Sequence, residues 1–174
     1  MPELAASSPT FTVRRARTPD VPAIARLVSG YAGDRILLHK ERVTYYEDVQ
    51  EFQVAVDADD RVIGCGALHV LWEDLAEVRT LAVDTGWHGR GVGHALLDLL
   101  LTRAGDLGVS RLFCLTFEVD FFVRHGFHEI EGTPVRPEVY AELLRSGDEG
   151  VAEFLDLARV KPNTLGNTRM LREL

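Results

Sequence analysis

The fold is decided by one stretch, residues 81–97, which reads Leu81-Ala82-Val83-Asp84-Thr85-Gly86-Trp87-His88-Gly89-Arg90-Gly91-Val92-Gly93-His94-Ala95-Leu96-Leu97. It joins a predicted strand to a predicted helix through alternate glycines. Glycines leave the main chain open to an anion, and the helix start supplies unpaired N–H groups with a partial positive dipole. The stretch therefore predicts a site that holds a pyrophosphate on backbone amides; the alternative is a tight turn without a ligand.

The spacing within this loop separates three kinds of phosphate-binding protein. A nucleoside triphosphate loop ends in Gly-Lys-Ser/Thr, and this loop has no lysine. A dinucleotide fingerprint needs Gly-x-Gly-x-x-Gly, but here Leu96 holds the last place. The remaining interpretation is an acyl-CoA loop, in which amides around Gly89, Gly91 and Gly93 bind the pyrophosphate and the preceding strand pairs with the pantetheine arm.

Composition limits the class of protein. The chain has 174 residues, of which 46% are hydrophobic, and this predicts one globular domain over residues 10–174 after a flexible tail at 1–9. A formal charge of −8 leaves no basic surface for nucleic acid. With no apolar stretch long enough for a membrane and no signal peptide at the start, we expect a cytoplasmic protein.

Periodicity predicts alternating strands and helices. Strands are expected at 10–15, 52–56, 62–71, 75–83, 111–117, 127–130 and 167–171, and helices at 18–30, 41–49, 92–104, 121–125, 136–145 and 151–157. Gly30 is expected to end the first helix. The predicted fold class is α/β or α+β, with a mixed, mostly antiparallel sheet of six to seven strands flanked by helices.

The predicted strand at 75–83 leads charged residues toward the glycine loop. Because side chains alternate across a strand, Glu77, Arg79, Leu81 and Val83 are expected to share one face.

These motifs together resemble the GCN5-related N-acetyltransferase (GNAT) family. The resemblance is carried by Leu81-Ala82-Val83, by His88-Gly89-Arg90-Gly91-Val92-Gly93 before a helix, and by Phe122-Val123-Arg124-His125-Gly126-Phe127, in an order and spacing that match over residues 10–130. It implies an acetyl-CoA-binding mixed sheet in which two strands, those holding Leu81 and Leu115, splay apart. The implied cofactor-binding residues are Leu81, Ala82, Val83, His88, Gly89, Arg90, Gly91, Val92, Gly93 and His94.

Three further stretches resemble a narrower group, the amino-acid N-acetyltransferases that act as N-acetylglutamate synthase in arginine biosynthesis. They are residues 64–68, 112–117 and 161–170, the last reading Lys161-Pro162-Asn163-Thr164-Leu165-Gly166-Asn167-Thr168-Arg169-Met170. The match is to the short, single-domain form of that enzyme. It implies acetyl transfer to the α-amine of L-glutamate, the first step of arginine biosynthesis.

Two positions depart from the pattern of the wider family. The loop usually begins with Gln or Arg, where this chain has His88, so a side-chain contact to phosphate is in question while the backbone amides remain. A Tyr that often protonates the departing thiolate is replaced by Phe122. The chemistry must proceed without that acid.

Acetyl transfer needs a neutral amine, a nearby thioester and stabilisation of an oxyanion. The resemblance makes the backbone N–H of Leu81 or Ala82 the oxyanion donor, against the alternative of an ordinary ladder hydrogen bond. Glu77 is the predicted general base, acting through a water. Its alternative is a simple ion pair with Arg79.

A glutamate acceptor brings two carboxylates, so its pocket needs cations. Lys40, Arg79 and Arg169 are the candidates, and the alternative for each is a solvated surface charge. No metal-ligand pattern is present, so we expect no metal. Cys65 and Cys114 are predicted to be reduced core thiols, with a nucleophilic Cys65 as the alternative.

The sequence leaves the acceptor and the class of function open. The same chemistry on L-glutamine, another amino acid or a small amine is the second hypothesis. A non-catalytic acyl-CoA-binding regulatory module is the third, motivated by the replacements at His88 and Phe122. For the assembly state, a homodimer is one expectation.

Overall fold

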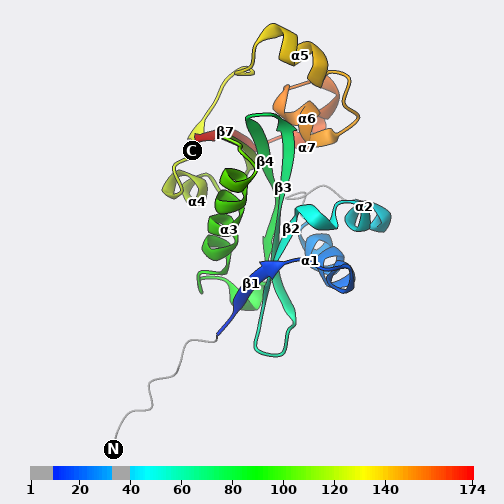
Figure 1. The fold of residues 1–174 in the computed structure, drawn as a ribbon, viewed down its shortest axis with the longest axis vertical. Helices are drawn as coiled ribbons and strands as arrows, with labels where there is room; N and C mark the ends of the chain where they lie inside the picture. The colour runs from blue at the N-terminus through cyan, green and yellow to red at the C-terminus, as the bar shows by residue number, and fades with distance from the viewer. Residues whose placement is uncertain (1–9, 33–39) are drawn as a thin grey trace, which may run out of the picture. The chain divides into compact units, whose positions relative to one another are not determined.

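The computed structural model describes residues 10–32 and 40–174. The predicted tail at 1–9 and the predicted loop at 33–39 lie outside the described residues. Within these ranges seven strands form a sheet in the order β1-β2-β3-β4-β5-β7-β6. The expected mixed, mostly antiparallel sheet with helices is confirmed (Figure 1).

The strands lie close to their predicted positions. They are β1 (Thr12–Arg15), β2 (Phe52–Val56), β3 (Val62–Trp72), β4 (Leu75–Val83), β5 (Arg111–Thr116), β6 (His128–Glu129) and β7 (Thr168–Glu173). The helices are α1 (Val21–Ala32), α2 (Arg42–Glu47), α3 (Val92–Asp106), α4 (Val119–Arg124), α5 (Pro137–Leu143), α6 (Glu149–Phe154) and α7 (Lys161–Thr164), with short 3-10 turns η1 (Thr18–Asp20), η2 (Val49–Glu51), η3 (Thr85–Trp87) and η4 (Ala158–Val160).

The prediction that Gly30 ends the first helix is wrong, because α1 continues to Ala32. Glycine inside a helix costs only about 1 kcal/mol relative to alanine. Buried Ile24 and Val28 pack the helix against the sheet, and this burial outweighs that cost.

Strand pairing explains the mixed character of the sheet. β1, β2 and β3 pair antiparallel, as do β5 with β7 and β7 with β6. β4 and β5 pair in parallel, with Leu75–Glu77 opposite Arg111–Phe113. A parallel pair needs a crossover, and α3 supplies it between β4 and β5.

Two compact units make up the chain, and β3, β4 and α3 contribute residues to both. The first unit is Met1–Ala67 with Thr80–Leu101, and the second is Leu68–Arg79 with Thr102–Leu174. That residues 10–174 form a single domain stays a prediction.

Each unit has its own apolar cluster. In the first, α1 packs with Phe52, Val54 and Ala82, while Leu96 of α3 packs with Ile63. In the second, the rings of Phe113 and Phe154 meet at 5.2 Å, joining β5 to α6. These clusters hold in place the strand and helices that carry the predicted site residues.

β4 contains one residue in an unusual conformation. Thr80 has φ of 58°, which is a genuine outlier for a β-branched side chain. Regular alternation requires every residue to be extended, so the shared face predicted for Glu77, Arg79, Leu81 and Val83 is interrupted between Arg79 and Leu81. Such strain tends to occur at functional sites.

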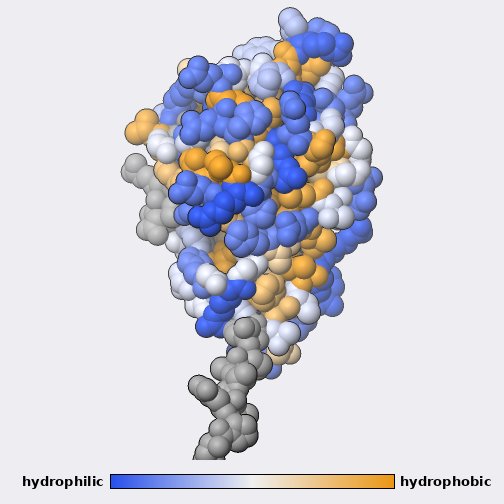
Figure 2. All heavy atoms as spheres, turned by 90° about the vertical axis from the view of Figure 1, so that its left-hand side faces the viewer, coloured by the Kyte–Doolittle hydropathy of each residue, from blue (hydrophilic) through white to orange (hydrophobic). Residues whose placement is uncertain are grey.

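The visible surface in Figure 2 is largely hydrophilic, with hydrophobic residues in scattered groups. Among the described residues, no helix combines the length and the apolar character that crossing a membrane requires.

Candidate functional site

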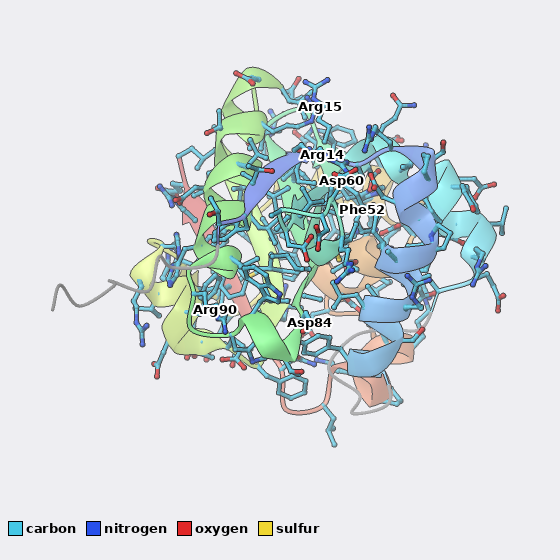
Figure 3. The ribbon with its side chains drawn as sticks, turned by 90° about the horizontal axis from the view of Figure 1, so that it is seen from below. Arg14, Arg15, Phe52, Asp60, Asp84 and Arg90 are labelled. Carbon is cyan, nitrogen blue, oxygen red and sulfur yellow. The ribbon has the colours of Figure 1, made fainter. Side chains whose placement is uncertain are left out.

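The predicted glycine loop connects β4 to α3 in the first unit. Asp84 begins it, accepting a hydrogen bond from the Gly86 N–H at 2.8 Å, and Arg90 follows after η3 (Figure 3). Gly89 and Gly91 have φ of 72° and 83°, a left-handed conformation that favours glycine. A Cβ at either position would meet nothing within 4 Å, so the backbone there faces open space.

The first turn of α3 follows directly on Gly91. N–H groups in the first turn of a helix have no partner inside it, and they carry the positive end of the helix dipole. Val92 is buried and anchors the helix, whereas Gly93 is half-buried and His94 is exposed. An open glycine backbone and the start of a 15-residue helix therefore coincide, which is the chemistry that binds phosphate.

Arg90 adds a positive side chain beside this backbone. Its guanidinium carbon lies 5.2 Å from the centroid of the Trp87 ring, within the range of a cation–π contact. The Trp87 ring is itself held edge-on by Phe11, with centroids 6.4 Å apart.

His88 takes a structural position that the sequence did not indicate. Its Nε2 lies 3.0 Å from the Val83 carbonyl oxygen and 2.9 Å from the Tyr31 hydroxyl. The Tyr31 hydroxyl also donates to the Val83 oxygen. With the proton on Nε2, His88 donates to this pair and ties the end of β4 to α1. Tyr31 of α1 supplies the polar contact on its side of this arrangement.

The strand residues predicted to bind cofactor flank the loop. Leu81 packs beside Gly66, where an added Cβ would meet Leu81 Cδ1 at 3.0 Å, and Ala82 is buried with Cys65. The role of the Leu81 N–H as an oxyanion donor stays a prediction.

In the second unit, Glu77 and Arg79 form the ion pair that was the alternative for Glu77. Arg79 Nε and Nη2 donate to Glu77 Oε2 at 2.9 and 2.5 Å. On its other side, Arg79 Nη1 and Nη2 donate to Asp148 Oδ2 and Oδ1 at 2.9 and 2.8 Å. The Arg79 side chain is only 9% exposed, so it is not a solvated surface charge. Two carboxylates already compensate it.

Asp148 connects the Glu77–Arg79 ion pair to α6, and these three residues are called the carboxylate cluster below. It is the N-cap of that helix and accepts from the Val151 N–H at 3.0 Å. Burial alone would raise its pKa, but the hydrogen bonds from Arg79 prevail and hold the pKa of Asp148 well below its usual range. Gly150 lets α6 approach: a Cβ there would meet Glu77 Oε2 and Arg79 Nη2 well inside 3.0 Å.

Glu153 is a site residue that the sequence analysis missed. It is 7% exposed and lies one turn after Gly150 in α6. Burial, followed by repulsion from Glu77, raises its pKa to about 8. A charged residue among apolar neighbours at 151–155 was the only sequence signal, and it is a weak one.

The two remaining predicted cations lie in different settings. Arg169 donates to the backbone carbonyls of Gly132, at 2.8 Å, and Phe154, and it lies 5.8 Å from the Phe113 ring. Its Nε is buried with no hydrogen-bond partner among the described residues, and burial lowers the pKa of Arg169. Lys40 is half-buried in the coil before α2.

Burial makes the two cysteines unsuitable as nucleophiles. Cys65 and Cys114 are free and buried, as predicted. Burial raises the pKa of the Cys65 thiol to about 12, so it is protonated at neutral pH and a poor nucleophile. Phe122 packs edge-on against Phe121 and Phe127. Among the described residues, no group of His, Cys, Asp and Glu is arranged to hold a metal ion.

The loop geometry and the mixed sheet agree with a comparison of family models. Residues 23–129 match the model described as the acetyltransferase (GNAT) family. The chain belongs to this family.

Two further matches extend over more than nine-tenths of the chain. It is 64% identical over 161 residues to a protein of Mycobacterium tuberculosis named amino-acid acetyltransferase, covering 91% of this chain and 92% of the relative. A crystal structure of Rv2747 from Mycobacterium tuberculosis, in complex with CoA and NLQ, superposes with a TM-score of 0.91 at 63% identity, covering 94% of this chain and 99% of that one.

A more distant match shares the fold. N-acetylglutamate synthase from Neisseria gonorrhoeae, complexed with coenzyme A and N-acetyl-glutamate, superposes with a TM-score of 0.75 at 24% identity. The match covers 95% of this chain but 35% of that one. The longer protein therefore contains this fold together with further parts.

Proposed function

We propose that this protein is an acetyl-CoA-dependent amino-acid N-acetyltransferase that acts on the α-amine of L-glutamate, as an N-acetylglutamate synthase. The observation that carries the proposal is 64% identity to a relative named amino-acid acetyltransferase, sustained over nine-tenths of both chains. Identity over such a length extends far beyond the glycine loop. The arginine-biosynthetic role, the cytoplasmic location and a homodimer stay predictions.

The glycine loop is the proposed binding site for the pyrophosphate of acetyl-CoA. Its support is the open backbone at Gly89 and Gly91, followed at once by the N-terminus of α3. Acetyl-CoA supplies a thioester, whose carbonyl carbon is the electrophile. The preceding residues Leu81, Ala82 and Val83 are the proposed partners of the pantetheine arm, and Arg90 and His94 supply side chains at the loop.

The proposed transfer is direct attack of the neutral amine on the thioester. Glu77 receives the first proton of the incoming ammonium through a water. The neutral amine then forms the C–N bond, and the Leu81 N–H stabilises the resulting oxyanion. The C–S bond breaks as the thiolate of CoA leaves, and the second proton of the nitrogen passes to solvent. A thiol with a pKa near 8.5 leaves unprotonated at a cost of about 2 kcal/mol at neutral pH, so Phe122 in place of Tyr is compatible with turnover.

Charge compensation ranks the candidate cations for the acceptor's carboxylates. Arg79 already binds two carboxylates, Glu77 and Asp148, which removes most of its attraction for a third. Within the described part of the chain, the hydrogen bonds of Arg169 go to backbone carbonyls, and its buried Nε–H has no partner. We therefore assign a substrate carboxylate to Arg169 first, to Lys40 second, and to Arg79 last.

The test follows thiol release from acetyl-CoA against a panel containing L-glutamate, L-glutamine, other amino acids and small amines. We expect release with L-glutamate, and a Glu77→Gln variant that loses turnover while it keeps acetyl-CoA affinity. Glu142→Gln, an exposed change on α5, is the matched control. Turnover far higher with L-glutamine would refute only the acceptor; acetyl-CoA binding without release for any amine would favour the regulatory module.

A further inference from the structure

Glu153 is a buried carboxyl that the proposed reaction does not yet use. Glu153 is only 7% exposed as a residue, but its carboxyl oxygens are not among the fully buried side-chain atoms of the described residues that lack a hydrogen-bond partner. Moving a carboxylate largely out of water and beside other carboxylates is nevertheless unfavourable. A position kept in this state calls for an explanation.

The charges around Glu153 come from each element packed on it. β4 contributes Glu77 and Arg79, and the N-cap of α6 contributes Asp148. His69 of β3 lies 3.7 Å from Asp148, and Glu149 faces Glu153 from its own helix.

Carboxylates outnumber cations in this cluster. Arg79 is already matched by Glu77 and Asp148. Among the groups that the structure describes here, an ionised Glu153 therefore adds a negative charge that only a protonated His69 would compensate. Desolvation and the repulsion from Glu77 both favour the neutral form of Glu153, which raises its pKa to about 8. The excess of carboxylates around one arginine therefore favours the protonated form of Glu153 in the free protein.

Glu153 lies on the same face of α6 as Gly150, which contacts the proposed base Glu77. Residues 150 and 153 are one helical turn apart and share a face of α6. The Gly150 backbone lies directly against Glu77 and Arg79, and the charges of these two residues act on Glu153. The side chains of Asp148 and His69 are about a quarter exposed, and the cluster reaches solvent at that edge.

We propose that Glu153 is a positioning residue for Glu77, neutral in the free protein and ionised when the ammonium group of the acceptor binds beside the cluster. The inference rests on the proposed function, because it needs an amine acceptor. An ammonium placed among these carboxylates supplies the missing positive charge and favours the ionised form. The proton of Glu153 passes to solvent, and the acceptor stays an ammonium in this step.

The released proton prepares the next step of the reaction. After it has left, Glu77 and Glu153 are both carboxylates, and Glu77 takes a proton from the ammonium to give the neutral amine. Glu153 acts here through its charge on Glu77.

Isothermal titration of L-glutamate into the protein, with CoA present in place of acetyl-CoA, tests this linkage. Titrations in buffers of different ionisation enthalpy report the protons released per acceptor bound. At pH 7 we expect about one proton from the wild type and close to none from Glu153→Gln, which imitates the neutral carboxyl. Glu142→Gln should match the wild type.

Equal proton release from the wild type and Glu153→Gln would overturn the inference, because the proton would then come from the ammonium itself. Thiol release measured on the same samples distinguishes the two proposals. If the protein turns over but both forms release the same number of protons, the proposed function stands and this inference fails. If the protein shows no acceptor binding and no turnover, both proposals are refuted. Carbon-13 NMR of the Glu153 carboxyl in the wild type needs no variant. Its midpoint should fall by about two pH units or more when L-glutamate binds, as the release of about one proton at pH 7 requires, and an unchanged midpoint counts against the proposal.

Discussion

The approach of α6 to β4 depends on the absence of a side chain at Gly150, and Gly150→Ala tests this packing. The added Cβ would lie well inside 3.0 Å of Glu77 Oε2 and Arg79 Nη2, and at 3.0 Å from Arg79 Cζ. Both side chains are almost fully buried and bonded to each other, so they have little room to move. Either α6 moves away or the contact between Arg79 and Asp148 opens.

Either response, movement of α6 or opening of the contact between Arg79 and Asp148, should lower the free energy of unfolding. Contacts restored to van der Waals distance need a displacement of roughly 1 Å. Overpacking of this kind costs about 1–3 kcal/mol, and loss of a buried ion-pair contact would bring it toward the upper end. For a chain of this length, each kcal/mol lowers the Tm by about 2–4 °C.

Urea denaturation of Gly150→Ala and Gly147→Ala provides the measurement. Gly147 is exposed and a Cβ there meets nothing within 4 Å, so its alanine variant should be as stable as the wild type or slightly more so. We expect Gly150→Ala to be destabilised by about 1–3 kcal/mol and to release thiol more slowly. Equal free energies of unfolding for the two variants would refute the packing argument.

Three further outcomes are expected. Asp148→Asn loses the carboxylate whose pKa Arg79 lowers, so its stability deficit should be full above about pH 5 and shrink as the pH falls, as measured by unfolding at several pH values; a constant deficit would contradict the ion-pair explanation. Gly91→Ala forces an alanine to a φ of 83°, and should weaken acetyl-CoA binding in titration calorimetry while the apo protein loses only about 1–2 kcal/mol. Tyr31→Phe removes the hydroxyl bonded to Val83 and should cost about 1 kcal/mol in unfolding free energy, with no loss arguing that water replaces the contact.

Local patterns in the sequence predicted the parts of the fold that short segments determine. β4 occupies the predicted range Leu75–Val83, and α3 begins at Val92 directly after the glycine loop. Alternation, helical periodicity and glycine spacing are properties of neighbouring residues, and these properties are visible without a structure. The predicted anion-binding loop accordingly has the geometry that its glycines indicate.

The environment of Arg79 was not predictable in the same way. Its partner Asp148 lies 69 residues later, and no local pattern links the two. Glu153 reads as an ordinary helical glutamate until α6 is packed on β4. Which of the candidate cations is compensated, and which carboxyl is neutral, are consequences of tertiary packing alone.

Thr80 has a consequence for how this protein responds to selection. A threonine at φ of 58° is disfavoured by about 1–3 kcal/mol relative to an extended residue, whereas glycine adopts that conformation freely. In a library selected only for heat resistance, glycine and asparagine should therefore accumulate at position 80, although most changes at buried positions reduce stability. A threonine retained under selection for turnover would mark the kink in β4 as a feature maintained for activity at the expense of folding free energy.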